Sequence, residues 1–118
     1  KYVHRICDAI NDVPLTVFSK GAFFALKSMK NLNCNTIGLD WTMDIGQAIN
    51  LFDNTKTLQG NLDPCVLYGD FKLIEKKTKE MLNNFAGNRH IANLGHGVYP
   101  DTDPDKVKCF IESVKSNN

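Results

Sequence analysis

The sequence predicts an α/β domain built around a parallel sheet. Apolar residues recur first with the spacing of a strand and then with that of a helix, and this alternation repeats along the chain. Strands that alternate with helices form parallel sheets with right-handed crossovers. The 118 residues are enough for one compact domain. Two architectures fit the pattern: a small flavodoxin-like open sheet, and one half of a (β/α)8 barrel, whose full length is roughly 250 residues.

The first half of the chain is expected to hold a helix and two strand–helix units. Val3, Ile6, Cys7 and Ile10 follow the i, i+3, i+4, i+7 spacing of an amphipathic helix. The predicted elements that follow are a strand over 14–18 with Pro14 at its first position, a helix over 21–30, a strand over 35–41, and a helix that Asp44 caps and that carries Ile45, Ala48, Ile49 and Phe52 on one face.

The second half repeats the pattern twice. Its predicted elements are a strand over 56–61, a helix that Asp70 caps and that carries Leu73, Ile74, Met81, Leu82 and Phe85, a strand over 89–94, and a helix that carries Val107, Phe110, Ile111 and Val114. Gly87 is a natural C′ residue for the longer helix. Asp103 followed by Pro104 is a strong start signal for the last one.

The carboxyl ends of the predicted strands carry polar and aromatic residues. They read Phe18-Ser19-Lys20, Asp40-Trp41, Gln59-Gly60-Asn61 and Asn93-Leu94-Gly95-His96. In both candidate architectures this end of a parallel sheet carries the chemistry. The fourth end attracts most interest because His96 stands between Gly95 and Gly97, where the glycines are expected to let the backbone turn sharply and leave the imidazole uncovered.

Composition excludes several classes of partner. With 42% hydrophobic and 23% charged residues and a net charge of +1, the chain offers no electrostatic reason to bind nucleic acid or an anionic membrane. No apolar run approaches the roughly 20 residues of a membrane span. The four cysteines form no CxxC motif and are expected to be reduced and mostly buried. The first residue is Lys1, so we expect a segment of a longer protein.

Three motifs of the chain resemble those of a known family. The segments GLDW (38–41), TLQGNLDPCVLYG (57–69) and RHIANLGHGVYPDTDPDKV (89–107) closely resemble the C-terminal part of uroporphyrinogen decarboxylases, and VPLTVFSKG (13–21) resembles the strand before them. The resemblance covers nearly the whole chain, in the right order and spacing. It implies that residues 1–118 are the C-terminal half, the last four βα units, of a (β/α)8 TIM barrel whose N-terminal half is absent.

The resemblance also implies an activity, that of a carboxy-lyase. The family removes carbon dioxide from the four acetate side chains of uroporphyrinogen III and gives coproporphyrinogen III, in haem and tetrapyrrole biosynthesis. It uses no metal and no organic cofactor, since a protonated pyrrole ring itself accepts the electrons that the departing carbon dioxide leaves behind. Family members form homodimers and act in the cytosol or in plastids. The aspartate and arginines that hold the substrate lie in the N-terminal half, and Asp40 and Arg89 do not take their place.

One family substrate contact falls on this chain, His96 of the NLGHG motif. At the end of a strand it could donate a hydrogen bond to a substrate carboxylate and, when protonated, offset its charge. A purely local hydrogen bond to a neighbouring loop is the alternative. His4 and His90 are expected to be structural.

The remaining motifs have simpler interpretations. Asp63-Pro64 should open a short helix. Asp40-Trp41 either shapes a pocket wall or is a capping aspartate beside a buried tryptophan. Gln59 and Asn61 could orient a loop of the active site rather than touch substrate.

Two rival functions stay open. Corrinoid- and thiol-dependent methyltransferases share the barrel, but some of them bind zinc through a His-x-Cys arrangement, and here Gly97 and Val98 follow His96. The other rival is a non-catalytic half barrel that binds a tetrapyrrole. A half barrel has two open sheet edges and an unfilled interior, so we expect the fragment alone to be inactive and to associate with itself or with the rest of a longer chain.

Overall fold

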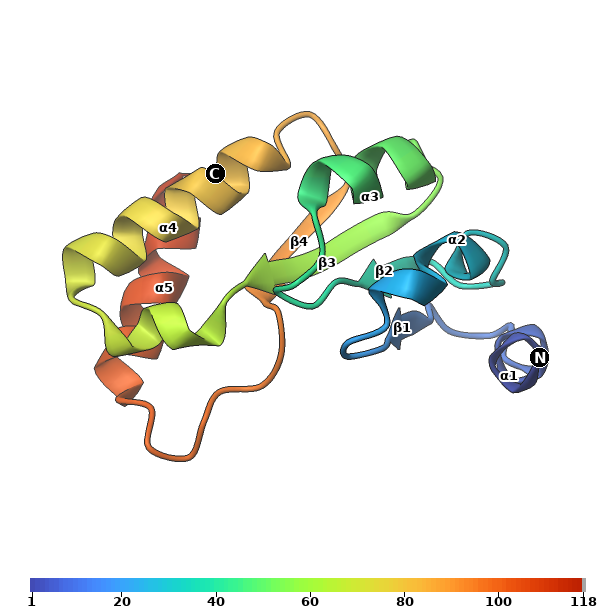
Figure 1. Cartoon of the computed structure of the whole chain (residues 1–118), viewed down its shortest axis with the longest axis horizontal. Coiled ribbons are helices and arrows are strands. Elements are labelled where there is room, and N and C mark those ends of the chain that lie inside the picture. The colour runs from blue at the N-terminus through green and yellow to red at the C-terminus, as the bar shows by residue number, and fades with distance from the viewer. Residues whose placement is uncertain (118) are drawn as a thin grey trace.

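The computed structural model describes residues 1–117. In chain order the elements are α1 (Tyr2–Ala9), β1 (Thr16–Phe18), η1 (Phe23–Ala25), α2 (Leu26–Met29), β2 (Thr36–Gly38), α3 (Ile45–Phe52), β3 (Thr57–Leu62), η2 (Pro64–Tyr68), α4 (Phe71–Asn84), β4 (His90–Leu94) and α5 (Pro104–Ser116). The η elements are 3₁₀ helices. All neighbouring strands pair in parallel, as the alternating sequence pattern predicts (Figure 1).

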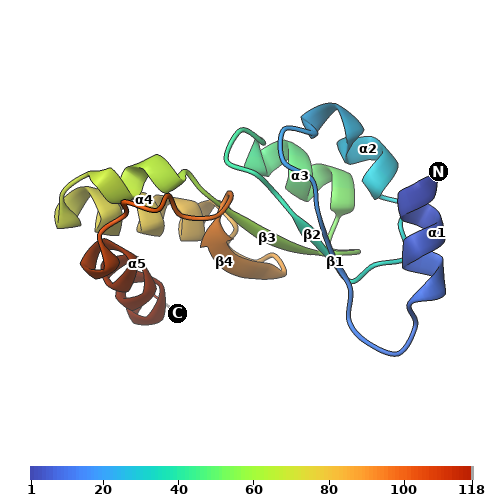
Figure 2. The same cartoon turned by 90° about the horizontal axis from the view of Figure 1, so that it is seen from below.

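The order of the strands decides between the two expected architectures. The sheet runs β1-β2-β3-β4, so that each strand lies beside the one before it in the chain. A flavodoxin-like sheet reverses its strand order at a switch point, whereas a barrel never does. Figure 2 shows α2, α3 and α4 on the same side of this sheet. The fold is therefore that of a partial (β/α) barrel, and the flavodoxin-like alternative is excluded.

Three aspartates begin three of the helices, as the sequence predicts. The Asp44 carboxylate accepts a hydrogen bond of 2.7 Å from the backbone N–H of residue 47, and Asp70 accepts one of 2.7 Å from that of residue 73. Asp103 accepts from residue 105 at 2.9 Å, and Pro104 follows it in the first turn. Each bond satisfies an amide at a helix start that has no partner within the helix. At the other end of α4 the C-cap is Phe85, so Gly87, with its positive φ of 79°, lies one residue beyond the C′ position predicted for it.

The helix predicted over 21–30 is shorter than expected. The structure forms one 3₁₀ turn over Phe23–Ala25 and one α-helical turn over Leu26–Met29. Phe23 and Phe24 are exposed, so only part of the apolar run faces the core. Without a continuous buried stripe, a longer helix has little tertiary packing to stabilise it.

The two faces of the sheet differ. Val17, Ile37 and Leu58 point toward the helices and belong to the core, in which Ile37 is fully buried. On the opposite face Phe18 and Ile91 are close to half exposed. Side chains of this kind fill the interior of a closed barrel in layers. The chain thus presents a barrel-interior surface, with β1 and β4 as the edges of the sheet.

The cysteine prediction was right only in part. All four cysteines are free, and Cys7 and Cys34 are buried. Cys65 is exposed on η2, and Cys109 is half-buried on α5. The expectation that most are buried is wrong because these two lie on helix surfaces rather than on the face that meets the sheet.

Candidate functional site

A cavity of about 270 Å³ lies at the carboxyl ends of the strands. All four strands or the loops directly after them contribute to it, through Phe18, Gly38, Leu39, Gln59, Asn93, Leu94, His96 and Gly97. The sequence predicts that the strand ends meet at one edge of the sheet, and this prediction is confirmed.

Three residues of one row across the sheet, Phe18, Gly38 and Gln59, form the floor of the cavity, and Ile91 continues the row beyond it. Phe18 pairs with Gly38, Gly38 with Gln59, and Gln59 with Ile91. The Phe18 ring lies over Gly38, where a Cβ would come within 2.8 Å of it. The absence of a side chain at Gly38 therefore allows the aromatic ring to spread across the sheet. The result is an apolar floor with the Gln59 amide beside it, which suits a ligand with a flat apolar body and polar substituents.

His96 lies at the wall of this cavity and is partly exposed. Its Nδ1 is 2.8 Å from the carbonyl oxygen of Gly97. A carbonyl only accepts, so Nδ1 carries the hydrogen and donates it. The imidazole also meets the ring of Tyr99 edge to face, with ring centroids 5.5 Å apart and an interplanar angle of 86°. The geometry leaves Nε2 for other contacts, although the ring does make the local hydrogen bond that the sequence suggested as an alternative.

The expectation for the two glycines beside His96 was right only in part. Neither has a positive φ, so neither is needed for a sharp turn. A Cβ on Gly95 would come within 2.2 Å of the backbone nitrogen of Trp41 and 2.7 Å of its Cα. A Cβ on Gly97 meets nothing within 4 Å. Gly95 is thus required for close packing of two backbones, and Gly97 leaves the space beside His96 open.

Asp40 ties the loops after β1 and β2 together. Its side chain is buried and accepts hydrogen bonds from the backbone N–H of Gly21 and from the N–H of Thr42 at 2.8 Å. The Thr42 hydroxyl donates to the same carboxylate. Burial raises the pKa of Asp40, but the hydrogen bonds from Thr42 and Gly21, together with nearby His96, outweigh it and hold the pKa below its usual value. The carboxylate is a fixed negative charge close to His96.

Asn61 acts as a brace rather than as a ligand. Its buried amide nitrogen donates to the carbonyl of Asp40 at 3.0 Å and to that of Met43 at 2.9 Å. The expectation that Asn61 orients a loop agrees with this geometry, whereas Gln59 lines the cavity. Trp41 is 46% exposed, so the interpretation of a buried tryptophan is wrong. Asp40 is the buried residue of this pair, and its carboxylate accepts from the backbone N–H groups of Gly21 and Thr42.

His90 is structural, as predicted. Its ring stacks on Phe85, with centroids 3.8 Å apart and 7° between the planes, and its Nε2 donates to the carbonyl of Gly60 at 2.6 Å. Burial lowers the pKa of His90 and outweighs the opposite effect of the hydrogen bond to Gly60. His4 lies on α1, away from the cavity residues. Asp63 opens η2 by accepting from the N–H of Cys65 at 2.9 Å, which confirms its predicted role.

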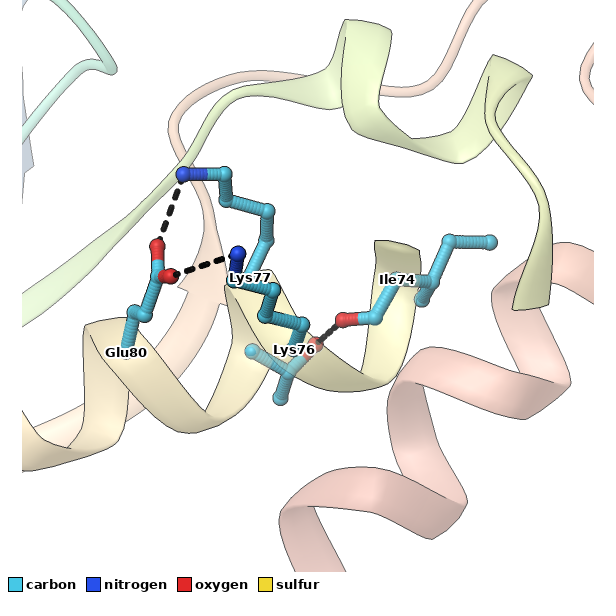
Figure 3. A network of polar contacts seen from close by, with 5 residues as sticks. Ile74, Lys76, Lys77 and Glu80 are labelled. Carbon is cyan, nitrogen blue, oxygen red and sulfur yellow. Dashed lines mark hydrogen bonds and ion pairs between the residues drawn. The ribbon is translucent and has the colours of Figure 1, made fainter. Parts of the chain in front are cut away.

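A larger cavity of about 660 Å³ lies between α3 and α4. Several of its polar groups already have partners: Asp44 and Asp63 cap helices, and Asn61 is the brace described above. Lys77 and Glu80 on α4 pair at 2.7 Å, with Lys76 on the other carboxylate oxygen at 4.0 Å (Figure 3). The Lys77 hydrogen bond lowers the pKa of Glu80. We therefore place the functional site at the strand ends and not here.

Metal-ligating and membrane-spanning features are absent from residues 1–117. Within that range, no three His, Cys, Asp or Glu side chains lie close enough together to hold a metal ion. None of the helices in the described part is both long and apolar enough to cross a membrane.

A partial (β/α) barrel with its cavity at the carboxyl ends of the strands defines the class of protein. The solved structure of a methyltransferase from Methanosarcina mazei has the same fold, with a TM-score of 0.81 over 97% of this chain and 34% of that one, at 16% identity. That likeness shows the fold alone.

Sequence comparison defines the family. The family model for uroporphyrinogen decarboxylase matches residues 1–117, and the chain belongs to that family. It is 44% identical over 106 residues to uroporphyrinogen decarboxylase of Ovis aries, covering 90% of this chain and 29% of that protein. Identity is 41% over 123 residues with the Schizosaccharomyces pombe protein, covering 94% and 34%. The chain thus spans about a third of the length of these relatives.

Proposed function

We propose that residues 1–118 work as the C-terminal half of a barrel whose other half supplies the remaining strands, and that the complete barrel is a uroporphyrinogen decarboxylase. The exposed barrel-interior face of the sheet supports this, because Phe18 and Ile91 then become interior side chains. The family membership and the relatives' greater length support it as well. The homodimer and the cytosolic or plastid location that the family resemblance implies stay predictions.

The proposed reaction turns the four acetate side chains of uroporphyrinogen III into methyl groups. In each, protonation of a pyrrole carbon makes the ring a cation, the bond between the methylene and the carboxylate breaks, and its electron pair enters the ring. Carbon dioxide leaves, the methylene carbon gains a proton, and the ring carbon gives up the proton that it took at the start, so that the pyrrole is restored and one proton is taken up for each carbon dioxide released. The ring itself accepts the electrons, so the protein needs to bind, orient and supply protons.

In this proposal His96 binds a carboxylate of the substrate, and the observation that supports it is the position of His96 at the wall of the strand-end cavity. Nδ1 already donates to the carbonyl of Gly97, so Nε2 has a hydrogen to donate only in the imidazolium form. A substrate carboxylate at Nε2 therefore accepts a hydrogen bond from a charged donor, and such a bond is stronger than one between neutral groups.

The test uses the complete protein that contains this chain, incubated with uroporphyrinogen III while loss of carboxylates is followed by chromatography. We expect coproporphyrinogen III from the wild type. His96→Ala should raise KM by on the order of tenfold or more, since a charge-assisted hydrogen bond is lost. His96→Gln, which donates without a charge, should fall between the two, and His4→Ala on α1 serves as the matched control.

Other outcomes would overturn the proposal. Untouched uroporphyrinogen together with methyl transfer to a thiol would establish the methyltransferase alternative. Tight binding of the substrate without turnover would establish the non-catalytic binding module. Turnover by residues 1–118 alone would contradict the need for a second half.

A further inference from the structure

The loop that carries His96 is tied to the neighbouring βα unit. This long loop joins β4 to α5 and lies outside every helix and strand (Figure 1). At Asp101 it meets η2, where the hydroxyl of Tyr68 donates to the Asp101 carboxylate at 2.6 Å. Tyr68 and Asp101 lie far apart in the sequence, so the bond fixes the loop to the element that follows β3.

A run of aromatic contacts leads from this bond to the imidazole. The ring of Tyr68 lies 6.1 Å from that of Tyr99, and Tyr99 meets His96 edge to face at 5.5 Å. The carbonyl of Tyr99 also accepts a hydrogen bond from the N–H of Thr102 at 3.0 Å, which closes the loop on itself. Aromatic pairs at such distances restrict ring orientation as well as position.

The backbone at the end of η2, next to Tyr68, is held in place by contacts with α5. Lys106, near the start of α5, donates to the carbonyl of Gly69 at 2.8 Å, and its ammonium group lies 4.0 Å from the centre of the Phe71 ring. Gly69 directly follows Tyr68. A cation held over an aromatic face and bonded to a carbonyl fixes that backbone position from the side of α5.

Packing of the core does not explain Tyr68. Its side chain is about half exposed, and so is Tyr99. The hydrogen bond to Asp101 raises the pKa of the Tyr68 phenol, so the donor proton stays in place at neutral pH. An exposed tyrosine that makes a short bond to an exposed carboxylate contributes little to stability but does restrict a loop.

We propose that Tyr68 and Asp101 are positioning residues that hold the His96 loop in the geometry that binds substrate, with Tyr99 as the contact that passes the restraint to the imidazole. The proposal rests on the role of His96 proposed above. By this proposal η2 contributes to substrate binding, although it lies far from His96 in the sequence.

The test is a double-mutant cycle on the complete protein. Tyr68→Phe removes the hydroxyl and keeps the ring, and Asp101→Ala removes the acceptor, whereas Asp101→Asn keeps an acceptor oxygen. We expect Tyr68→Phe and Asp101→Ala to raise KM for uroporphyrinogen III by roughly three- to tenfold with kcat nearly unchanged, because the lost bond is exposed. Asp101→Asn should recover much of the loss, and Tyr2→Phe on α1 is the matched control.

The same cycle includes His96→Ala. In that background Tyr68→Phe should have no further effect, since the group that it positions is gone. An equal effect with and without His96, or a fall in kcat with unchanged KM, would overturn the proposal.

A readout independent of turnover separates this proposal from the proposed function. Nuclear magnetic resonance of the histidine ring nitrogens, assigned with His96→Ala, reports whether Nδ1 of His96 stays protonated and ordered. We expect Tyr68→Phe to shift or broaden the His96 signals, and unchanged signals would refute the positioning role. If the wild type fails to decarboxylate but these signals respond, the proposed function is wrong and the restraint on His96 stands.

Discussion

The two glycines beside His96 give a direct test of why the backbone is built as it is. Gly95→Ala places a methyl group 2.2 Å from the backbone nitrogen of Trp41 and 2.7 Å from its Cα. These are backbone atoms, so no side-chain rotation relieves the clash. The loops after β2 and β4 must separate by at least about 1.2 Å to restore ordinary contact. The backbone N–H of Gly95 also donates to the carbonyl of Leu62 at 2.7 Å, which resists that movement.

Overpacking of this kind costs up to about 3 kcal/mol. Gly97→Ala is the matched control, because a methyl group there meets nothing within 4 Å and the backbone has no positive φ. It should be neutral or gain up to about 1 kcal/mol through the unfolded state. The free energy of unfolding is measured by urea denaturation, followed by circular dichroism. Trp41, the single tryptophan of the chain, reports the local change by fluorescence. Equal destabilisation by the two substitutions would refute the close-packing explanation.

Three further predictions concern buried polar groups. Asp40→Asn should cost about 1–3 kcal/mol of unfolding free energy, because an amide cannot accept all of the hydrogen bonds that the carboxylate accepts. The stabilisation from Asp40 is present above the ordinary pKa of 3.8 and is lost as the pH falls through the lowered pKa of the folded state. The urea midpoint measured against pH should therefore fall less steeply at acid pH in the variant than in the wild type. Asn61→Ala should cost about 2 kcal/mol or more of unfolding free energy, because the carbonyls of Asp40 and Met43 lose their donors. Thermal unfolding measures this cost, and a destabilisation smaller than that of an exposed asparagine variant would contradict the prediction. His90 should stabilise the fold fully above its ordinary pKa of 6.5 and progressively less as the pH falls through its lowered folded-state pKa, because burial beside Phe85 disfavours the charged form. His90→Gln keeps a donor but does not titrate, so the stability of this variant should lose that pH dependence. A pH profile of stability that is the same in the variant and the wild type would argue against this role.

Local signals in the sequence predicted the elements of this fold well. Asp44, Asp70 and Asp103 each cap a helix in the structure, because a cap involves only residues two or three positions apart. The position of His96 at the end of the last strand followed from the same reasoning, combined with the rule that the ends of parallel strands meet.

The sequence could not predict contacts between distant segments. The contact of Gly95 with Trp41 joins loops after different strands, so the sequence alone pointed to a turn as the reason for the glycine. The buried Asp40 carboxylate accepts from the amide of Gly21, a residue on yet another loop, and the neighbouring Trp41 is exposed. Tyr68 gave no signal at all, since its partner Asp101 lies in another βα unit. Only the folded sheet brings these residues together.

The consecutive order of the strands has a consequence for the way the chain acquires its site. Thr16 pairs with Thr36 and Thr36 with Thr57, so the first three strands can assemble from short-range contacts as the chain is synthesised. Pairing of Leu58 with His90 closes a longer loop. β4 is therefore the last strand to join, and it brings His96 together with Asn93, Leu94 and Gly97 to an edge that already carries the cavity residues of the first three strands. In this order of events the binding site forms only when the sheet is complete, so a chain interrupted before β4 lacks both the edge strand and the imidazole.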